Sequence, residues 1–356
     1  MKLEAYQTIK LGHDAYHVAS NPNGDIVAIS RNNEISIIRS STVSNVTFCT
    51  THTIGSVSIH PSQECLSVVD KLTGCLLLID FKGKTVAQLL PIPKKSTSQY
   101  TEYNGYECCS FDPTGKLIIC GQHIDENTFL LRAIDFTTLK VVTQTQIKDP
   151  FGDSYSSIFP TGKPNLYSLW LAAGQDGQVV YWSNITTNSI DCSFEPSFKH
   201  CTPPAFSPAF DCLLIANEIG DLEKRNYPKT EDVVSMTIAT DDEPEMPLSH
   251  SIQFIDNRFA ICQTMDNRVY AIDTSEMNIA FEVELIGHEP QPPAYYYPGL
   301  YDEYGLCTDI NYFQRAGHSI VFFTDIKESK SQTCAEIIRV PIDEIRKLTI
   351  AHKNGH

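Results

Sequence analysis

Two groups of residues in this sequence are of types that could carry chemistry. Eleven histidines are present, and four of them recur seven to nine residues ahead of a proline- or asparagine-containing turn, namely His13, His52, His200 and His250. Histidines could transfer protons or bind a metal, provided that several groups come within hydrogen-bond or coordination reach. Residues 289–305, EPQPPAYYYPGLYDEYG, combine tyrosines with the carboxylates of Glu289, Asp302 and Glu303. Whether either group converges depends on the elements that position it.

A pattern of four short strands recurs along the chain. In residues 56–90, SVSIHPSQECLSVVDKLTGCLLLIDFKGKTVAQLL, four apolar runs are separated by turn residues. Seven copies follow the same order, and the turn after each first strand contains one marker residue: Pro22, Pro61, Pro113, Pro160, Pro208, Asn257 and Ala316. The series shows no helical periodicity except near residues 342–348, where a turn of helix is expected. Copies of about this length predict an all-β, seven-bladed β-propeller.

The repeats set the expected blade boundaries within a single domain, residues 1–356. The blades are predicted at residues 12–50, 51–92, 104–147, 154–195, 200–240, 250–286 and 306–345. The last copy runs out of chain after its third strand, whereas residues 2–11, KLEAYQTIKL, alternate as a strand does. We therefore expect residues 2–11 to complete the last blade as its outer strand, which would remove the weak seam in the ring.

The motifs at the ends of these strands resemble those of the WD-repeat family. In that family a Gly-His pair precedes the first strand and a Trp-Asp pair ends the third. Here Gly12 and His13 occupy the first position, and an Ile-Asp pair replaces Trp-Asp at Asp80, Asp135 and Asp273. The resemblance implies a hydrogen-bond network of histidine and a neighbouring aspartate that braces each blade. It therefore implies structural roles for His13, His52, His200, His250, Asp80, Asp135 and Asp273.

The central strands offer few groups for catalysis. Their residues are mostly small or apolar, and the titratable groups among them are His17, His60, Asp112 and Asp309. Repeat histidines in separate blades would lie around the ring and not at one focus. The sequence also lacks a P-loop, a G-x-S-x-G elbow, an H-E-x-x-H motif and an EF-hand loop. We expect no catalytic residue, no cofactor and no metal.

Tyrosines concentrate in the connections between blades. If each blade runs from inner to outer strand, these connections emerge on one face of the propeller. Three of them, between blades two and three, three and four, and six and seven, hold Tyr100, Tyr103, Tyr106, Tyr155, Tyr295, Tyr296, Tyr297, Tyr301 and Tyr304, with Asp302 and Glu303. Tyrosine gives a large contact area at low rotamer cost. These side chains either bind a partner or cap the blades, and the sequence leaves both alternatives open.

Composition limits the partners. The formal net charge is −16, which disfavours nucleic acid and suits a basic protein or peptide. No apolar run approaches the length of a membrane span, and the N-terminal residues do not form a secretory signal. The 12 cysteines include no C-x-x-C pair, and many fall inside apolar runs, which favours a reducing, cytoplasmic location without disulfides or structural zinc.

The leading hypothesis is a non-catalytic scaffold that binds a protein or peptide through an acidic, tyrosine-rich face. The alternative is a propeller enzyme or small-ligand binder of the sugar or lactone class that uses the same face. In that alternative, Glu289, Asp302 and Glu303 would supply the acid and base, and two carboxylates would converge in a deep cleft.

Overall fold

The chain folds into seven sheets, each built on the predicted four antiparallel strands, so the all-β, seven-bladed β-propeller is confirmed. The computed structural model describes residues 2–354 apart from residues 4–6, 16, 31–33, 40–41, 48–53, 95–103, 153, 162, 164, 174–175, 184–187, 200, 218–219, 239–247, 265–267, 286–311 and 330–331. Two compact units are present, a four-blade unit of residues 16–201 and a three-blade unit of residues 1–15 and 202–356. The expectation of a single domain stays a prediction.

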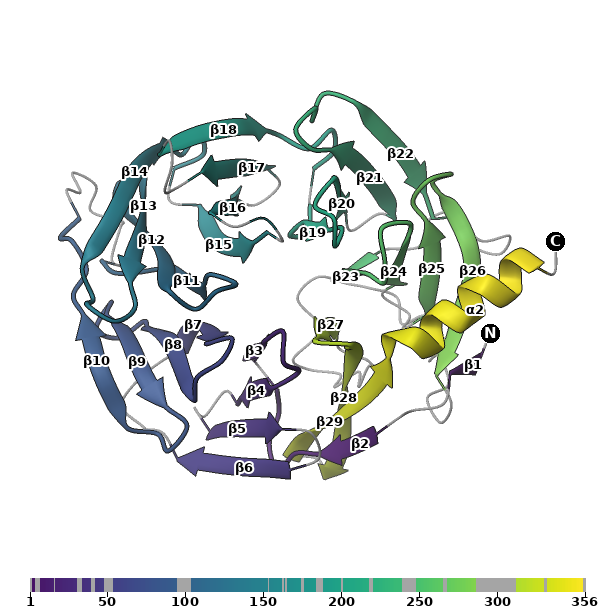
Figure 1. Cartoon of the computed structure of the whole chain (residues 1–356), viewed down its shortest axis with the longest axis horizontal. Coiled ribbons are helices and arrows are strands. Elements are labelled where there is room, and N and C mark those ends of the chain that lie inside the picture. The colour runs from purple at the N-terminus through teal and green to yellow at the C-terminus, as the bar shows by residue number, and fades with distance from the viewer. Residues whose placement is uncertain are drawn as a thin grey trace. The chain divides into compact units, whose positions relative to one another are not determined.

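The four-blade unit contains the first four repeats in chain order. Their strands are β3 (His17–Ser20), β4 (Ile26–Ile29), β5 (Glu34–Arg39) and β6 (Thr42–Thr47); β7 (Ile54–Ile59), β8 (Cys65–Asp70), β9 (Leu76–Asp80) and β10 (Thr85–Leu89); β11 (Cys108–Phe111), β12 (Leu117–Asp125), β13 (Thr128–Asp135) and β14 (Val141–Lys148); β15 (Tyr155–Pro160), β16 (Leu166–Ala173), β17 (Asp176–Ser183) and β18 (Ser189–Phe194). Within this unit the first strands contact one another from blade to blade, and the fourth strands lie on its convex side (Figure 1).

The three-blade unit contains the remaining repeats. Their strands are β19 (Ala205–Phe206), β20 (Cys212–Ala216), β21 (Asp221–Asn226) and β22 (Val233–Thr237); β23 (Leu248–Phe254), β24 (Phe259–Thr264), β25 (Val269–Asp273) and β26 (Asn278–Leu285); β27 (Tyr312–Ala316), β28 (Ser319–Ser329) and β29 (Gln332–Pro341). Each sheet follows the repeat order, with neighbouring strands hydrogen-bonded.

The N-terminal residues close the last blade, as expected. Strand β2 (Gln7–Lys10) pairs antiparallel with β29 and is the fourth, outer strand of that sheet. Residues 2 and 3 are not part of this pairing, however. Strand β1 (Lys2–Leu3) instead pairs parallel with the outer edge of β26 and becomes a fifth strand of the sixth blade. The N-terminal segment thus joins two blades of its unit, because the outer edge of a fourth strand offers backbone groups for pairing.

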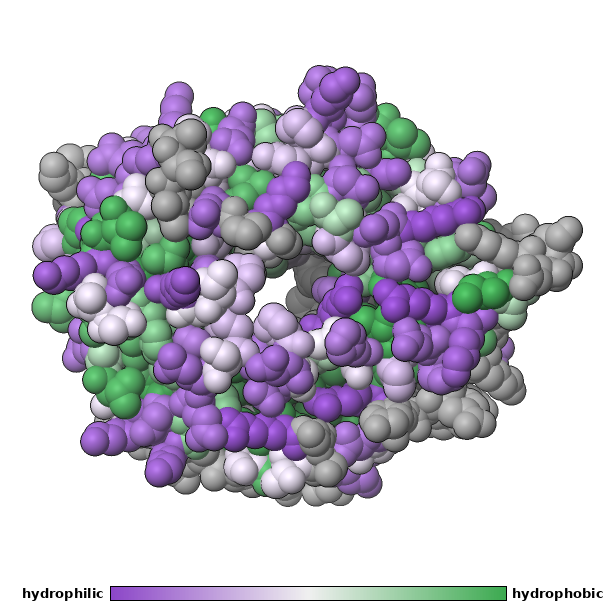
Figure 2. All heavy atoms as spheres, viewed as in Figure 1, coloured by the Kyte–Doolittle hydropathy of each residue, from purple (hydrophilic) through white to green (hydrophobic). Residues whose placement is uncertain are grey.

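Burial explains why middle and outer strands differ in sequence. Strand β8 is buried at all six positions, because its two faces pack against neighbouring blades. The outer strands β10 and β14 are largely exposed and carry more polar residues. Val86, Val141 and Val142 are exposed exceptions on these two strands. Figure 2 shows apolar side chains among hydrophilic ones in the region where Figure 1 labels β10 and β14.

Helix α2 (Ile342–Asn354) is longer than the single turn that the sequence predicts. It begins directly after Pro341, and Asp343 and Glu344 lie in its first turn, where carboxylates favour the positive end of the helix dipole. Ile342 and Ile345 are buried in the core of the sixth and seventh blades, with Leu348 packed against it. This apolar stripe holds the helix on β26 and β29.

Candidate functional site

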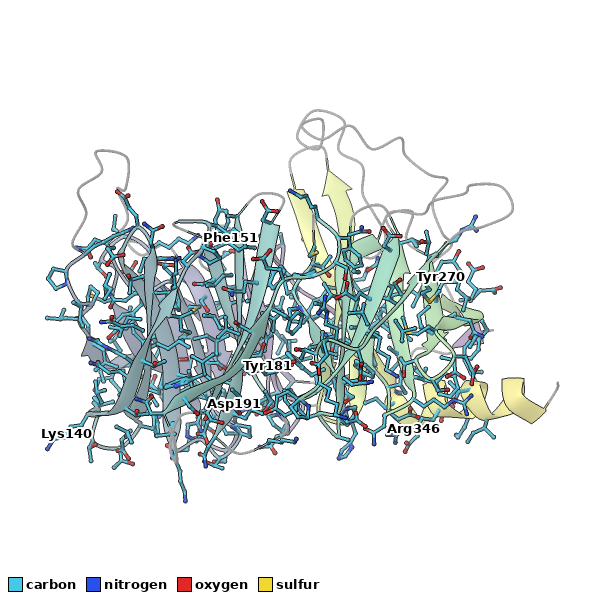
Figure 3. The ribbon with its side chains drawn as sticks, turned by 90° about the horizontal axis from the view of Figure 1, so that it is seen from above. Lys140, Phe151, Tyr181, Asp191, Tyr270 and Arg346 are labelled. Atoms are coloured by element: carbon cyan, nitrogen blue, oxygen red, sulfur yellow. The ribbon has the colours of Figure 1, made fainter. Side chains whose placement is uncertain are left out.

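The described ends of two tyrosine-bearing connections come together in the four-blade unit. One connection joins β10 to β11, and its described residues are 90–94 and 104–107. The other joins β14 to β15 and contains Asp149 and Ser154. Figure 3 shows Phe151 of the second connection at the opposite edge of the unit from Lys140 and Asp191. Both connections therefore leave their blades at the same end, as the propeller pattern predicts.

A buried histidine, His123, links the two connections. It lies near the end of β12 and is 2% exposed. Its Nδ1 lies 2.9 Å from both carboxylate oxygens of Glu107, and its Nε2 lies 3.0 Å from Oδ2 of Asp149. The backbone N–H of His123 also donates to Glu107 at 2.8 Å. Glu107 immediately precedes β11 and Asp149 immediately follows β14, so His123 joins the start and the end of the third blade.

The two carboxylates keep His123 charged. Burial acts to lower the pKa of His123, but hydrogen bonds to Asp149 and Glu107 and the charges of both carboxylates outweigh it and raise that pKa to about 9. Burial acts to raise the pKa of Asp149. Hydrogen bonds from His123, Ser154 and Phe151 outweigh it and lower that pKa to about 2. At neutral pH His123 is therefore a cation, and its partner Asp149 is an anion.

Full pairing of both ring nitrogens decides what this cluster does. A protonated imidazole that donates at Nδ1 and Nε2 has no lone pair with which to accept a substrate proton. A general base must be able to reach and accept the proton that it abstracts. His123 therefore acts as a brace between the two connections.

Asp149 shapes the connection that presents Tyr155. Its Oδ1 accepts hydrogen bonds from the Phe151 N–H at 2.9 Å and the Ser154 hydroxyl at 2.8 Å. Its Oδ2 accepts the Ser154 N–H at 3.0 Å. The next residue is Tyr155, whose side chain is 85% exposed. A fully buried carboxylate thus fixes the backbone beside the most exposed large hydrophobic side chain of the described residues.

Tyr106 takes the capping alternative that the sequence left open. Its side chain is 1% exposed and belongs to the core between the second and third blades. Its hydroxyl donates to the Leu90 carbonyl at 3.4 Å and accepts from Nη1 of Arg132 at 3.2 Å. Unlike Tyr155, Tyr106 packs the seam between blades and offers no ring to a partner.

Gln122 holds the beginning of the connection between β10 and β11. This side chain is fully buried; its Nε2 donates to the Ile92 carbonyl at 2.7 Å, and its Oε1 accepts the Ile92 N–H at 3.0 Å. Gln122 and His123, adjacent on β12, thus hold residues 92 and 107 on either side of the undescribed part of the connection. Both described ends of this connection are therefore held by β12.

The remaining tyrosines of the expected face lie outside the described residues. They are Tyr100, Tyr103, Tyr295, Tyr296, Tyr297, Tyr301 and Tyr304, together with Asp302, Glu303 and the alternative catalytic Glu289. His52 and His200 are also outside them. His250 lies in β23. The assignment of these positions stays a prediction.

The repeat aspartates end the third strands β9, β13 and β25, where the resemblance places them. Each of them caps the following turn. Asp80 accepts the N–H groups of Lys82 and Lys84, Asp135 accepts from Thr138, and Asp273 accepts from Ser275 and pairs with Arg258. None of the described hydrogen bonds joins one of these aspartates to a histidine. The Nδ1 of the buried His13 donates to the Asp14 carbonyl oxygen at 2.6 Å. These aspartates cap turns, and the histidine–aspartate network that the resemblance implies stays a prediction.

Sequence reasoning missed His123 and its two partners. Glu107 and Asp149 are 16 and 26 residues away from it along the chain, and only the strand register brings the three together. One signal was present: polar, titratable residues flank the apolar strands of the third repeat in GYECCSF, CGQHIDE and IKDPFGDS. His60, predicted near the central strands, is also structural, because its Nε2 lies 3.0 Å from the Gly115 carbonyl oxygen and its ring packs on Phe111 and Phe136.

Comparisons with known proteins extend the fold assignment. No protein-family model and no curated protein matches the sequence. The structure is similar to that of the β-propeller domain of Cps50 (Swd1) from Myceliophteria thermophila, with a TM-score of 0.59. The similarity covers 94% of this chain and 100% of that domain at 11% sequence identity. At this identity the similarity shows the fold, and because 1349 solved chains match, the fold does not select a function.

Two features of the described residues bear on metal binding and on membranes. Within the described part of the chain, no group of three or more histidine, cysteine, aspartate or glutamate side chains is arranged to hold a metal ion. Among the same residues, no helix has both the length and the apolar character that a bilayer crossing requires.

Proposed function

We propose that this protein is a non-catalytic scaffold that binds a protein or peptide of basic character through the acidic, tyrosine-rich face formed by its inter-blade connections. The observation that carries the proposal is Tyr155, an 85% exposed aromatic side chain at the first residue of β15, directly after a connection held by the buried Asp149–His123 pair. An exposed aromatic residue on a fixed backbone loses little conformational entropy when a partner binds.

Charge at the same end of the third blade supports a basic partner. Glu107 remains 19% exposed while it binds His123, and Asp125 and Glu126 are partly exposed in the adjacent β12–β13 hairpin. The net charge of −16 adds a long-range attraction for cations. Complementary charge of this kind raises association rates and selects against acidic partners.

The sequence extends this surface beyond Tyr155. Tyr100 and Tyr103 belong to the connection whose ends Gln122 and His123 hold. Tyr295, Tyr296, Tyr297, Tyr301 and Tyr304, with Asp302 and Glu303, belong to the connection between β26 and β27. A surface built from several connections would recognise an extended partner, because each connection contributes one part of the contact.

Capture of basic peptides on the immobilised full chain tests the proposal. We expect lysine- and arginine-centred peptides to bind in an array and their glutamate-centred counterparts not to bind. Binding should weaken when salt rises from about 50 to 300 mM, because surface charges are screened. Tyr155→Ala should weaken capture by about tenfold, as loss of an aromatic contact residue does. The triple variant Tyr295→Ala, Tyr297→Ala and Tyr301→Ala should weaken it further.

A matched control is Lys140→Ala, just before β14 at the opposite edge of the neighbouring third blade, which should leave capture unchanged (Figure 3). Equal losses of peptide capture for Tyr155→Ala and Lys140→Ala would contradict a binding face at this end of the blades. Loss of the fold in the triple variant would assign those tyrosines to capping. Turnover in a glycan and lactone panel would favour the enzymatic alternative.

A further inference from the structure

Arg132 lies in the seam between the second and third blades. It is in β13, paired with Cys120 of β12 on one side and Gln144 of β14 on the other. Its side chain is 8% exposed and contacts Tyr106, which packs with Leu76 and Leu78 of the second blade. The seam therefore surrounds a guanidinium group with apolar and neutral groups.

The positive charge of Arg132 has no counter-ion among the described residues. Nη1 donates to the Tyr106 hydroxyl at 3.2 Å, and Nε is buried without a hydrogen-bond partner. Burial raises the pKa of Tyr106 to about 12, with the Cys120 thiol adding to this and Arg132 opposing it, so the phenol is neutral at pH 7. A guanidinium has five N–H donors, and here one neutral oxygen accepts from it.

Another buried arginine of the chain shows what full pairing looks like. Arg225 in β21 is 7% exposed, and its Nε donates to the carboxylate of Glu223 on the same strand. Its Nη1 donates to the Thr230 carbonyl at 2.8 Å. Burial of an unpaired charge opposes folding, whereas a counter-ion offsets much of that effect. Arg132 matches Arg225 in burial and differs from it in lacking the anion.

The surroundings of Arg132 suit a carboxylate on an apolar stem. Gln144 lies in register beside Arg132 on the edge strand β14 and is exposed. Side chains opposite one another in an antiparallel pair share a face of the sheet, so its amide is on the face of Arg132. Ala87 and Leu89 of β10, partly buried, pack against the same apolar cluster from the second blade. The seam therefore offers an arginine fork beside an apolar cluster, with Gln144 on the same face of the sheet.

We propose that Arg132 binds a carboxylate group of a ligand at the seam between the second and third blades. An aspartate, glutamate or C-terminal carboxylate of a protein segment and a small organic acid share this chemistry. The planar guanidinium matches a carboxylate in a bidentate geometry. This site is independent of the acidic face, since it takes the opposite charge and does not use Tyr155.

Thermal unfolding of the full chain in sodium acetate, compared with sodium chloride at equal ionic strength and pH 7, tests the proposal. We expect acetate to raise the unfolding midpoint saturably, by roughly 2 °C or more, because a ligand of the folded state stabilises it by mass action. Arg132→Met should have a higher midpoint than the wild type in chloride and should not respond to acetate. Arg225→Met, the matched control, should lower the midpoint and keep the acetate response, because Glu223 loses its partner.

A second measurement covers the case in which Arg132→Met does not fold. The Nε–H resonance of Arg132 in the wild type, assigned by its loss in Arg132→Lys, should shift when acetate is added. Absence of this shift, or an equal acetate response in wild type and Arg132→Met, would overturn the proposal.

A peptide arm distinguishes the two ligand sources. We expect an N-acetylated, C-terminally amidated hexapeptide with one glutamate among alanines to move the same resonance, and its glutamine counterpart not to move it. Movement with acetate and not with the glutamate peptide would assign the site to small acids. Tyr155→Ala should leave both responses intact, so failure of the acidic face and failure of this site are distinguishable.

Discussion

Two buried cations of the third blade, His123 and Arg132, differ in how their charge is met. His123 is held by two carboxylates, one from each end of the blade. Arg132 donates to one neutral hydroxyl and has a buried Nε without a partner. A cation that is fully paired inside a fold braces the elements that supply its anions, whereas one that is incompletely paired remains able to gain from an anion. In one sheet, His123 is therefore a structural charge, whereas Arg132 is a candidate recognition residue.

Replacement of His123 is the most severe test of its role as a brace between the two connections. His123→Ala leaves Glu107 and Asp149 without their shared cation, and breaking a buried ion pair in this way costs about 3–5 kcal/mol. Urea unfolding of the variant and the wild type measures the free energy of unfolding. His318→Ala, at an exposed histidine, is the control and should change it by less than about 0.5 kcal/mol. A small loss for His123→Ala would show that the cluster does not brace the connections.

The pH dependence of stability sharpens the same point. The pKa of His123 is about 9 in the folded chain and 6.5 in the unfolded one, so its contribution is complete below pH 6.5 and is lost as pH rises through 9. The interval corresponds to at most about 3 kcal/mol. On the acid side, the lowered pKa of Asp149 predicts a loss from about pH 3.8 down to about 2. Both losses arise from the same pair and are not additive.

Free energies of unfolding at pH 6 and pH 9.5 measure the alkaline effect. The wild type should lose more stability between these pH values than His123→Gln does. The difference between the two proteins removes the contributions of the other titrating groups. Parallel losses in both proteins would contradict a charged His123.

Gln122→Ala tests whether neutral side chains also hold the connection. The change removes both hydrogen bonds to the Ile92 backbone, which we expect to cost about 1–2 kcal/mol. Faster hydrogen exchange at the Ile92 amide should accompany the loss. The control is Gln146→Ala. Gln146 is an exposed glutamine of β14, and its replacement should change neither the free energy of unfolding nor the exchange rate.

The smallest expected effects distinguish Tyr106 from Tyr155, the two tyrosines of the expected face that lie among the described residues. Tyr106→Phe removes a buried hydroxyl that bonds Leu90 and Arg132 and should cost about 1 kcal/mol. Tyr155→Ala should change the free energy of unfolding by less than about 0.5 kcal/mol, because the side chain is 85% exposed. A larger loss for Tyr155→Ala than for Tyr106→Phe would reverse their assignment to recognition and capping.

Much of the fold was predictable because its signals are local. Proline- and glycine-containing turns and short apolar runs appear in order in each repeat, and Asp80, Asp135 and Asp273 end third strands as expected. The N-terminal strand was predictable from the missing fourth strand of the last repeat. The pairing of Lys2 and Leu3 with β26 was not, since any outer edge offers the same backbone groups.

The candidate site was less predictable because burial is a property of neighbours. Tyr106 and Tyr155 occupy similar positions just before or at a first strand, yet one packs in a seam and the other faces solvent. Their sequences contain no signal for this difference, because it depends on which blade lies beside each ring.

By itself, the sequence determined the seven four-stranded repeats, their order and the concentration of tyrosines between blades. Turn residues and alternating polarity act over a few consecutive residues, so they can be recognised in the sequence without knowledge of tertiary contacts. Only the tertiary structure decided that His123 meets Glu107 and Asp149, that Arg132 meets a neutral hydroxyl, and that Tyr106 is buried. Strand register and blade packing fix those contacts, and they are set by the burial of many residues at once.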